Sequence, residues 1–416
     1  GRLRPGNRLP AVRALAEELG VNRNTVSSAY QRLAAAGIVL ADGRRGTRIT
    51  AAPPLAPAPG RARPGPGVRC LEVGGPDPGL LPPLGPVLRQ LEPPVRNYGE
   101  ETNLPELLEV GREYFANDGF RKGRLAVASG ALDSLERVLR VHLRPGEAVG
   151  IEDPGFLAGV ALVRSLGLNT VPIGVDEEGE LPDALHRALR QRVRAVILTP
   201  RAQNPTGAFL TRRRAKTLRE VIARDPRLLV LEDDHCGPIS GAPAISVAYG
   251  HQGPWAIIRS VGKFLGPDLR LGFILGDEAT VARLEGHMAL GMRWVSHLLQ
   301  HLVVRLWADR SVHRLVEKAS RSYERRRTAL LRALRERGVQ AFGRSGLNVW
   351  VPVVREVDTV QGLLQTGWAV AAGEGFRLES QPGIRITTST LLPEESERLA
   401  EELARILSPA EMSSVA

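Results

Sequence analysis

The sequence predicts an α/β protein with two parts of unequal size, a small basic N-terminal unit (residues 1–50) and a large C-terminal domain (residues 68–416). Helical and strand patterns alternate from about residue 90 onward, which is typical of a sheet covered by helices. A stretch dense in Pro, Ala and Gly at residues 51–67 lies between the two parts and predicts an extended linker. The 416 residues are enough for two or three domains.

Composition argues against several classes of protein. No apolar run approaches the roughly 20 residues of a membrane-spanning helix, and residues 1–5 do not resemble a signal peptide. The two cysteines, Cys70 and Cys236, are too few for a disulfide framework and lack metal-ligand spacing, so we expect Cys236 to pack in the core. We therefore expect a soluble protein of the reducing cytoplasm with no bound metal.

Positive charge is concentrated at the N-terminus. Residues 1–50 hold nine arginines against three acidic residues, which is more than half of the net charge of +11 in about an eighth of the chain. A local excess of this kind favours an anionic partner, and double-stranded DNA is the first candidate. A merely solvated basic surface is the alternative.

The N-terminal unit has the pattern of two short helices followed by a hairpin. The first helix is predicted over residues 10–20, and Asn22 can cap the second. Apolar residues of the second helix follow helical spacing, at Val26, Tyr30, Leu33 and Ala34. Residues 38–40 and 47–50 flank a short turn and predict a β-hairpin. This order of elements is typical of a winged helix-turn-helix.

In such a unit, the first side chains of the second helix face the base edges of DNA. Here these residues are Asn22, Arg23, Asn24 and Thr25. Arginine pairs with guanine and asparagine with adenine, while threonine contacts a base or a phosphate. Arg44 and Arg45 at the hairpin tip are placed for phosphate or the minor groove. A protein-interaction module with a basic face is the alternative.

Residues 8–39, RLPAVRALAEELGVNRNTVSSAYQRLAAAGIV, resemble the DNA-binding domain of the GntR family of bacterial regulators. That domain has a further helix before the stretch that begins here at Gly1. The resemblance therefore implies that residues 1–50 form a winged helix-turn-helix whose first helix is missing, and that DNA binding by this exact chain is open.

The C-terminal domain has short apolar runs that predict buried parallel strands, at 148–151, 195–198, 228–231 and 256–258. Helical stretches such as 132–143 and 212–224 lie between them. The last hundred residues mix helices with strands at 347–351 and 384–387, which predicts a smaller α+β lobe.

Lys263 is the first candidate for chemistry. Only four of the 56 basic residues are lysines, and unlike arginine a lysine can form a Schiff base. Ser260 and Arg270 flank Lys263, and a hydroxyl and a guanidinium are suited to hold the phosphate of an aldehyde cofactor. An ordinary surface lysine in a loop is the alternative.

Three further segments suit the same kind of ligand. Ser129-Gly130-Ala131 precedes a helix whose free N–H groups suit a phosphate, although ordinary capping explains it equally well. Asn204-Pro205-Thr206-Gly207 follows a strand and is either a turn or a partner for a ring hydroxyl. Asp233 follows another strand, where a carboxylate can keep a pyridine nitrogen protonated. A helix cap or a metal ligand is the alternative for Asp233.

Together and in this order, these segments resemble the fold-type-I pyridoxal-5′-phosphate (PLP) enzymes, the aminotransferase superfamily. The resemblance rests on Tyr98-Gly99, Ser129-Gly130-Ala131, Glu152-Asp153-Pro154-Gly155-Phe156, Asn204 to Gly207, Asp233, Ser260 with Lys263 and Arg270, and Arg385. It implies a large, mostly parallel sheet with a smaller C-terminal lobe. With the N-terminal unit, the whole chain resembles the MocR subfamily of GntR regulators.

The resemblance implies a role for each residue. Lys263 would form the internal aldimine, Asp233 would pair with the pyridine nitrogen, and Asn204 would contact the ring oxygen. Arg385 would hold the α-carboxylate of an amino acid, with a surface ion pair as its alternative. The other expected cofactor contacts are Phe156 on the ring face, His235 where many relatives have a tyrosine, Gly130, Ala131, Ser260 and Arg270 at the phosphate, and Tyr98 from the second subunit of a homodimer.

The sequence therefore predicts a transcription regulator that senses PLP, or an amine or amino acid, through the aldimine at Lys263. An active PLP-dependent aminotransferase is the second hypothesis, and a nucleic-acid-binding protein with a cofactor-free domain is the third. The segments LTPRAQNPTG, LEDDHCG and GRSGLNVWVPV resemble a MocR subgroup that includes a regulator of pyridoxal kinase, which points to vitamin B6 metabolism.

Overall fold

The computed structural model describes residues 6–35, 39–41, 46–49, 65 and 67–408. The predicted hairpin tip, with Arg44 and Arg45, and most of the predicted linker lie outside these residues. Within the described ranges, no helix is long and apolar enough to cross a membrane.

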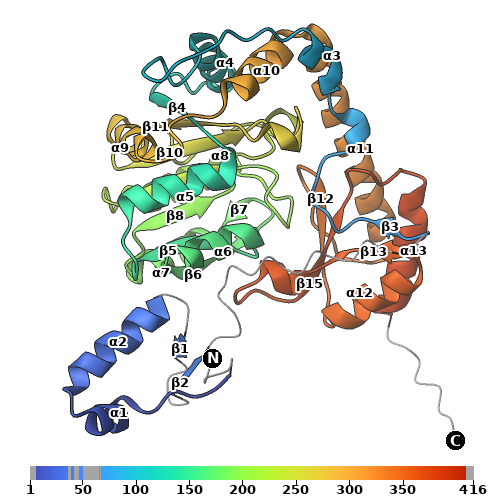
Figure 1. The fold of residues 1–416 in the computed structure, drawn as a ribbon. Helices are drawn as coiled ribbons and strands as arrows, with labels where there is room; N and C mark the ends of the chain where they lie inside the picture. The colour runs from blue at the N-terminus through green and yellow to red at the C-terminus, as the bar shows by residue number, and fades with distance from the viewer. Residues whose placement is uncertain (1–5, 36–38, 42–45, 50–64, 66, 409–416) are drawn as a thin grey trace, which may run out of the picture.

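The N-terminal unit contains the predicted elements: α1 (Val12–Leu19), α2 (Arg23–Ala35), β1 (Val39–Ala41) and β2 (Thr47–Ile49) (Figure 1). Gly20 ends α1 in the left-handed conformation, with φ of 65°, which glycine adopts without steric cost. The side chain of Asn22 caps α2 by accepting from the Asn24 backbone N–H at 2.8 Å. Strands β1 and β2 pair antiparallel, which confirms the winged helix-turn-helix.

An eight-stranded sheet forms the large lobe of the C-terminal domain. Its order is β4 (Arg124–Ala128), β11 (Gly272–Gly276), β10 (Trp255–Ser260), β9 (Leu229–Asp233), β8 (Ala195–Leu198), β5 (Ala148–Asp153), β6 (Asn169–Asp176) and β7 (Gly179–Glu180). The four predicted strands, β5, β8, β9 and β10, lie together and run parallel. Strand β11 runs antiparallel between β4 and β10, so the sheet is mixed.

Helices cover both faces of this sheet. One apolar core lies under α5 (Ala131–His142), α6 (Leu157–Ser165) and α9 (Glu278–Ala289). A larger core lies under α4 (Pro105–Ala116), α7 (Pro182–Arg190), α8 (Arg212–Ile222) and α10 (His297–Ala308). Burial on both faces explains why the central strands are apolar throughout rather than alternating.

The small lobe contains the predicted C-terminal strands. Its elements are α11 (Arg310–Glu336), β12 (Asn348–Pro352), α12 (Glu356–Gln365), β13 (Trp368–Ala369), β14 (Ala371–Ala372), β15 (Gly383–Thr387) and α13 (Glu395–Leu407). Strand β3 (Arg69–Cys70), far earlier in the chain, pairs parallel with β13 (Figure 1). The first strand after the predicted linker is thus built into the C-terminal lobe.

Candidate functional site

The sheet brings several predicted residues to one edge. Strands β4, β10 and β9 run in the same direction, so their carboxyl ends lie at the same edge. Ser260 is in register with Gly272, which in turn pairs with Ala128 just before the Ser129-Gly130 turn. Asp233 pairs with Ile258 on β10. The candidate site is therefore assembled from the loops that leave this edge.

Lys263 lies in the loop after β10, and its side-chain amine donates a hydrogen bond to the carbonyl of Gly74. Burial lowers the pKa of Lys263, as does the nearby Arg385, while Cys236 and Asp233 act in the opposite direction. A lower pKa increases the neutral fraction of the amine, which is the form that attacks an aldehyde. The environment of Lys263 therefore suits attachment to an aldehyde cofactor.

Asp233 and Asp234 are adjacent acids with opposite environments. Asp234 is paired with Arg201 and Arg259 at 2.7 and 2.9 Å. These arginines hold the pKa of Asp234 well below its usual value, although burial opposes them. Asp233 is 7% exposed, and its Oδ1 atom has no hydrogen-bond partner among the described residues.

Burial, with the nearby Asp234 and Glu152, raises the pKa of Asp233 to about 7, while Lys263 acts in the opposite direction. A buried carboxylate without a partner is costly, and a cationic ligand atom would relieve that cost. Asp233 therefore fits the protonated nitrogen of a pyridine ring, and Asp234 does not.

Asn204 and Arg385 lie side by side. Arg385 donates to the Asn204 side-chain oxygen at 3.1 Å and to the carbonyl of Glu72, and its guanidinium lies 4.7 Å from the centre of the Phe376 ring. Arg385 is only 5% exposed, so it is not a surface residue.

The residues predicted to bind a phosphate also lie close together. Gly130 caps α5 with φ of 88°, and a Cβ at this position would lie 3.4 Å from the Arg270 guanidinium. Arg270 Nη2 lies 3.5 Å from the Ser129 carbonyl, and Ala131 is the first residue of α5. The Ser260 hydroxyl accepts from the Gly262 backbone N–H at 3.2 Å. A helix N-terminus beside an exposed guanidinium suits a phosphate.

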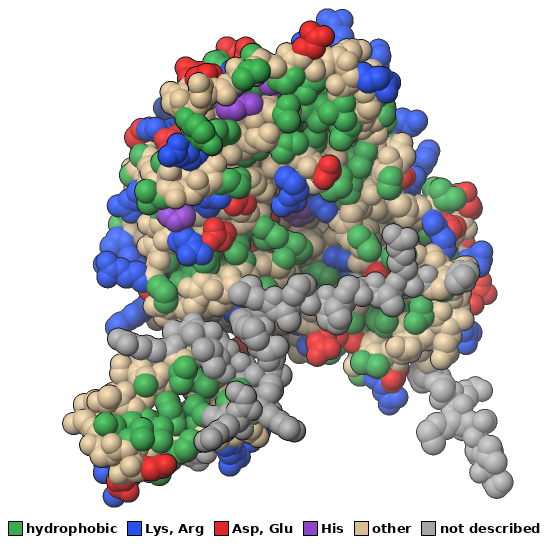
Figure 2. All heavy atoms as spheres, in the orientation of Figure 1, with side chains coloured by type: hydrophobic (Ala, Val, Ile, Leu, Met, Phe, Trp, Pro, Cys, Tyr) green, Lys and Arg blue, Asp and Glu red, His purple; other side chains and the backbone are tan. Residues whose placement is uncertain are grey.

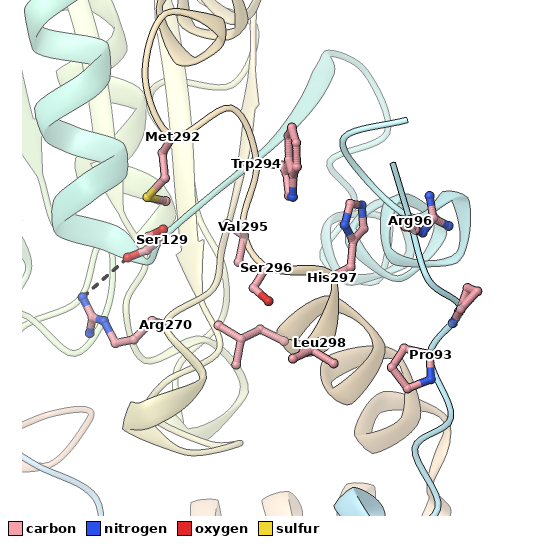
Figure 3. A pocket seen from close by; sticks show the side chains of 12 residues that line it. Pro93, Arg96, Ser129, Arg270, Met292, Trp294, Val295, Ser296, His297 and Leu298 are labelled. Atoms are coloured by element: carbon pink, nitrogen blue, oxygen red, sulfur yellow. Dashed lines mark hydrogen bonds between the residues drawn. The ribbon is translucent and has the colours of Figure 1, made fainter. Parts of the chain in front are cut away.

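Ser129 and Arg270 also line one side of a pocket of about 600 Å³ (Figure 3). Trp294, Ser296 and Leu298 line other parts of it. Tyr98 lies near this region, with its ring 6.3 Å from that of Trp294, and is 82% exposed. Among the described residues, no hydrogen bond or ring contact joins Tyr98 to the residues predicted to bind the phosphate, so its role across a subunit boundary stays a prediction.

Phe156 and His235 complete the predicted set. Phe156 directly precedes α6 and is 38% exposed. Burial and the nearby Lys263 lower the pKa of His235 to about 4, although Asp234 opposes them. His235 is therefore neutral at physiological pH and offers either a donor or an acceptor to a ring oxygen.

Two supporting residues were not anticipated from the sequence. Gln203 is fully buried and donates to Glu152 at 3.0 Å and to the Pro154 carbonyl at 2.9 Å, which fixes the loop of Asn204 against the loop of Phe156. Asp153 accepts three backbone N–H bonds from residues 378–380 and so joins the large lobe to the small lobe. The sequence does show both as polar residues near strand ends. It does not show their hydrogen-bond partners, which lie far away in the chain.

On the N-terminal unit, residues 22–25 are all exposed at the start of α2. The Asn22 side chain is engaged in capping the helix, whereas Arg23, Asn24 and Thr25 extend from its first turn. The arrangement suits a helix that presents its N-terminal side chains to a DNA groove.

Two sequence families match the chain. Residues 89–403 match aminotransferase class I and II, and residues 1–49 match the bacterial regulatory proteins of the gntR family. The chain is a GntR-family regulator of the MocR type. Its class I and II aminotransferase domain accounts for most of its length.

Curated relatives agree with this MocR-type architecture. The vitamin B6 salvage pathway transcriptional repressor PtsJ of Salmonella typhimurium is 40% identical over 410 residues, which cover 98% of this chain and 95% of the repressor. The HTH-type transcriptional regulator TauR of Rhodobacter capsulatus is 30% identical, covering 86% of this chain and 82% of TauR.

Solved structures support the fold of the MocR-type C-terminal domain. Kynurenine aminotransferase of Pyrococcus horikoshii has a TM-score of 0.73 at 21% identity, covering 82% of this chain and 91% of the enzyme. An archaeal alanine:glyoxylate aminotransferase has a TM-score of 0.74 at 20% identity, covering 82% and 90%. The predicted fold class, a winged helix-turn-helix joined to an aminotransferase-like α/β domain, is confirmed.

Proposed function

We propose that this regulator holds PLP at Lys263 and that occupancy of this site changes its affinity for a double-stranded DNA operator. The proposal depends on two residues at one sheet edge. Lys263 has a lowered pKa, and the buried Asp233 has an Oδ1 atom without a hydrogen-bond partner among the described residues. The same chain carries a GntR helix-turn-helix, so cofactor and DNA sites belong to one molecule. We propose that residues 51–67 are the linker between the N-terminal unit and the C-terminal domain.

Each side chain would have a defined task in holding the cofactor. Lys263 would attach to its aldehyde, and Asp233 would hold a proton on the ring nitrogen and so keep its own negative charge. Asn204 and His235 would contact the ring oxygen, with Phe156 on the ring face. Gly130, Ala131, Ser260 and Arg270 would hold the phosphate. When bound, PLP supplies an aldehyde that combines with amines and a ring that withdraws electrons.

Arg385 is the candidate group for an effector carboxylate. Its buried guanidinium, which donates to Asn204 and to the Glu72 carbonyl in this structure, has the paired N–H geometry that matches a carboxylate. We propose that the effector is PLP itself, or an amine or amino acid that combines with it at Lys263. The name of the Salmonella relative supports vitamin B6 salvage as the regulated pathway. We propose the cytoplasm as the site of action.

A homodimer would complete the site with Tyr98 of the second copy. Figure 2 shows hydrophobic side chains gathered over the upper part of the C-terminal domain, near α3 (Leu84–Arg89) and α10. Leu88 and Leu298 there are 52% and 56% exposed, and Met292 in the pocket wall is 50% exposed. Sedimentation should give a dimer at micromolar concentration. A monomer that still binds PLP tightly would contradict the dimer.

A working aminotransferase is the second candidate function. It is favoured by Lys263 and Arg385 facing the same short segment, with a lowered pKa at the lysine. Incubation with PLP and a panel of amino acids tests it, because transamination releases 2-oxo acids. Turnover that does not require the N-terminal unit, together with no DNA binding, would favour the enzyme over the regulator.

One titration tests the main proposal. PLP is added to the full chain while its visible absorbance and its binding to a DNA duplex from upstream of its own gene are followed. We expect a saturable visible band and a change in DNA affinity over the same PLP range. A chain with no band, or with no salt-dependent affinity for that duplex with or without PLP, would contradict the proposal.

A further inference from the structure

The segment Leu71–Asp77, which we call the bridging segment, is held at both ends by the small lobe. At its start, the Leu71 N–H donates to Ala369 at 2.7 Å, and the Leu71 carbonyl accepts from Thr387 at 2.8 Å. At its end, Asp77 pairs with Arg326 at 2.8 Å, and its N–H donates to the Tyr323 hydroxyl at 3.1 Å. Displacement of the residues between these anchors would therefore act on Leu71, which directly follows β3.

The middle of the bridging segment contacts the two groups on which the proposed function depends. The Gly74 carbonyl accepts the hydrogen bond of the Lys263 amine, and the Glu72 carbonyl accepts from Arg385. The segment also lies close against Arg385, because a Cβ on Gly74 would come within 3.1 Å of its guanidinium. Glu72 and Gly74 follow β3 and are partly buried, with Val73 between them 65% exposed.

These contacts compete with ligand binding. A lysine nitrogen joined to an aldehyde keeps at most one proton, and its position is set by the cofactor. The Arg385 Nη2 group, which donates to the Glu72 carbonyl, is one of the donors that would bind a carboxylate. Binding at either residue therefore withdraws a donor from the bridging segment, and a ligand shifts an equilibrium when its contacts differ between the two states.

The bridging segment directly follows β3, the strand by which the chain enters the C-terminal domain. Residues 51–67 of the predicted linker precede β3, and β3 leads directly into Leu71. Arg69 of β3 is fixed by Glu395 through two bonds of 2.8 Å and by the Thr390 carbonyl. We propose that the bridging segment transmits occupancy of Lys263 and Arg385 to the N-terminal unit. This inference rests on the proposed function and names the regulatory element of that site.

Two neighbouring glycines give a matched test. Gly74→Ala places a methyl group against the Arg385 guanidinium, whereas a Cβ on Gly75 would meet only Val73, at 3.8 Å. Operator affinity is measured for the full chain with and without PLP, using the duplex from upstream of its gene. We expect PLP to change this affinity by about fivefold or more in the wild type and in Gly75→Ala. In Gly74→Ala the change should fall below about twofold, as for weakly coupled sites.

A second pair of variants tests the attachment of β3 to α13 and leaves the proposed PLP contacts unchanged. Arg69→Ala removes the bonds to α13, while Arg405→Ala removes a pair within that helix, to Glu402. We expect Arg69→Ala to bind PLP as the wild type does, by visible titration, with a reduced PLP effect on operator affinity. Hydrogen exchange of residues 68–77 should change on PLP addition in the wild type and in Arg405→Ala.

The outcomes separate the two proposals. A wild type that neither binds PLP nor responds to it would overturn the proposed function and this inference together. A wild type that responds, with Gly74→Ala and Arg69→Ala responding as strongly as their controls, would overturn the bridging segment alone. Should Gly74→Ala fail to fold, by circular dichroism, the comparison of Arg69→Ala with Arg405→Ala decides.

Discussion

The N-terminal unit and the candidate site at the sheet edge of the C-terminal domain place their candidate residues in opposite ways. In the N-terminal unit, residues 22–25 are consecutive and exposed, and the buried apolar residues described in this unit are Ala16, Val26 and Val39. At the candidate site, the residues are spread in sequence from Gly130 to Arg385, and the sheet that carries them lies between two extensive apolar cores. Exposed side chains can bind a large partner with little support, whereas a small ligand needs polar groups held inside a packed structure.

This difference predicts how substitutions will act. A buried polar group has few alternatives when its partner is removed, so its loss should act in nearly all-or-none fashion. An exposed contact in a DNA interface is one of many, so its loss should act in modest, additive steps. The predictions below start with buried polar groups of the candidate site and end with exposed DNA contacts.

The largest effect is expected at Lys263. Lys263→Ala should abolish the visible band and the covalent attachment of PLP after borohydride reduction, while phosphate contacts keep some cofactor bound. Lys216→Ala, on the exposed face of α8, is the matched control and should behave as the wild type. Peptide mapping that finds the reduced label on Lys122, Lys216 or Lys318 would refute the assignment.

A large effect is also expected at Asp233. Asp233→Asn removes the negative charge opposite the ring nitrogen, so PLP affinity should fall by at least about tenfold, in line with the loss of a buried charge partner. Equilibrium titration by absorbance measures it. An unchanged affinity would mean that Asp233 does not face the ring.

The same variant should show a pH effect in protein prepared without PLP. Because the pKa of Asp233 is raised to about 7, its neutral form stabilises the fold, and this contribution is lost as the pH rises from about 4 to about 7. The amide introduced by Asp233→Asn does not ionise, so the variant should become more stable relative to the wild type over this range, by about 1–3 kcal/mol. Denaturant unfolding at pH 5 and pH 8 measures the difference. A constant difference at both pH values would argue against a raised pKa.

Intermediate effects are expected on the recognition helix. Arg23→Ala and Asn24→Ala should each cost about 1–3 kcal/mol at the cognate site and relax sequence preference, since both side chains would face bases. Binding to the upstream duplex and to base-substituted duplexes measures this. Equal losses on all duplexes would instead assign these residues to the phosphate backbone.

The smallest effect is expected from Arg44 and Arg45, which lie outside the described residues. Replacing either by alanine should weaken specific and non-specific DNA binding alike. It should also reduce the slope of log binding constant against log salt concentration by about one unit. Binding isotherms at several salt concentrations test it. A selective loss at one base pair would show that the arginine reads sequence.

Much of the fold was predictable because it depends on local pattern. Apolar runs of strand length predicted β5, β8, β9 and β10 to within about two residues. Strand β11 was not singled out, because its antiparallel place between β4 and β10 depends on pairing across the sheet. The predicted site residues came from short motifs, but Gln203 and Asp153 were missed because their partners are distant in sequence.

The sequence by itself determined that the protein has two parts and which kinds of side chain lie at each candidate site. It also singled out Lys263, because a lysine can form a Schiff base and an arginine cannot. These are local properties, carried by periodicity, capping and side-chain chemistry. Only the tertiary structure decided that Asp234 is neutralised by Arg201 and Arg259 while Asp233 is not, and that Gly74 meets Lys263. Burial and pairing arise from residues brought together by the fold, and they set the pKa values and competing contacts on which a ligand would act.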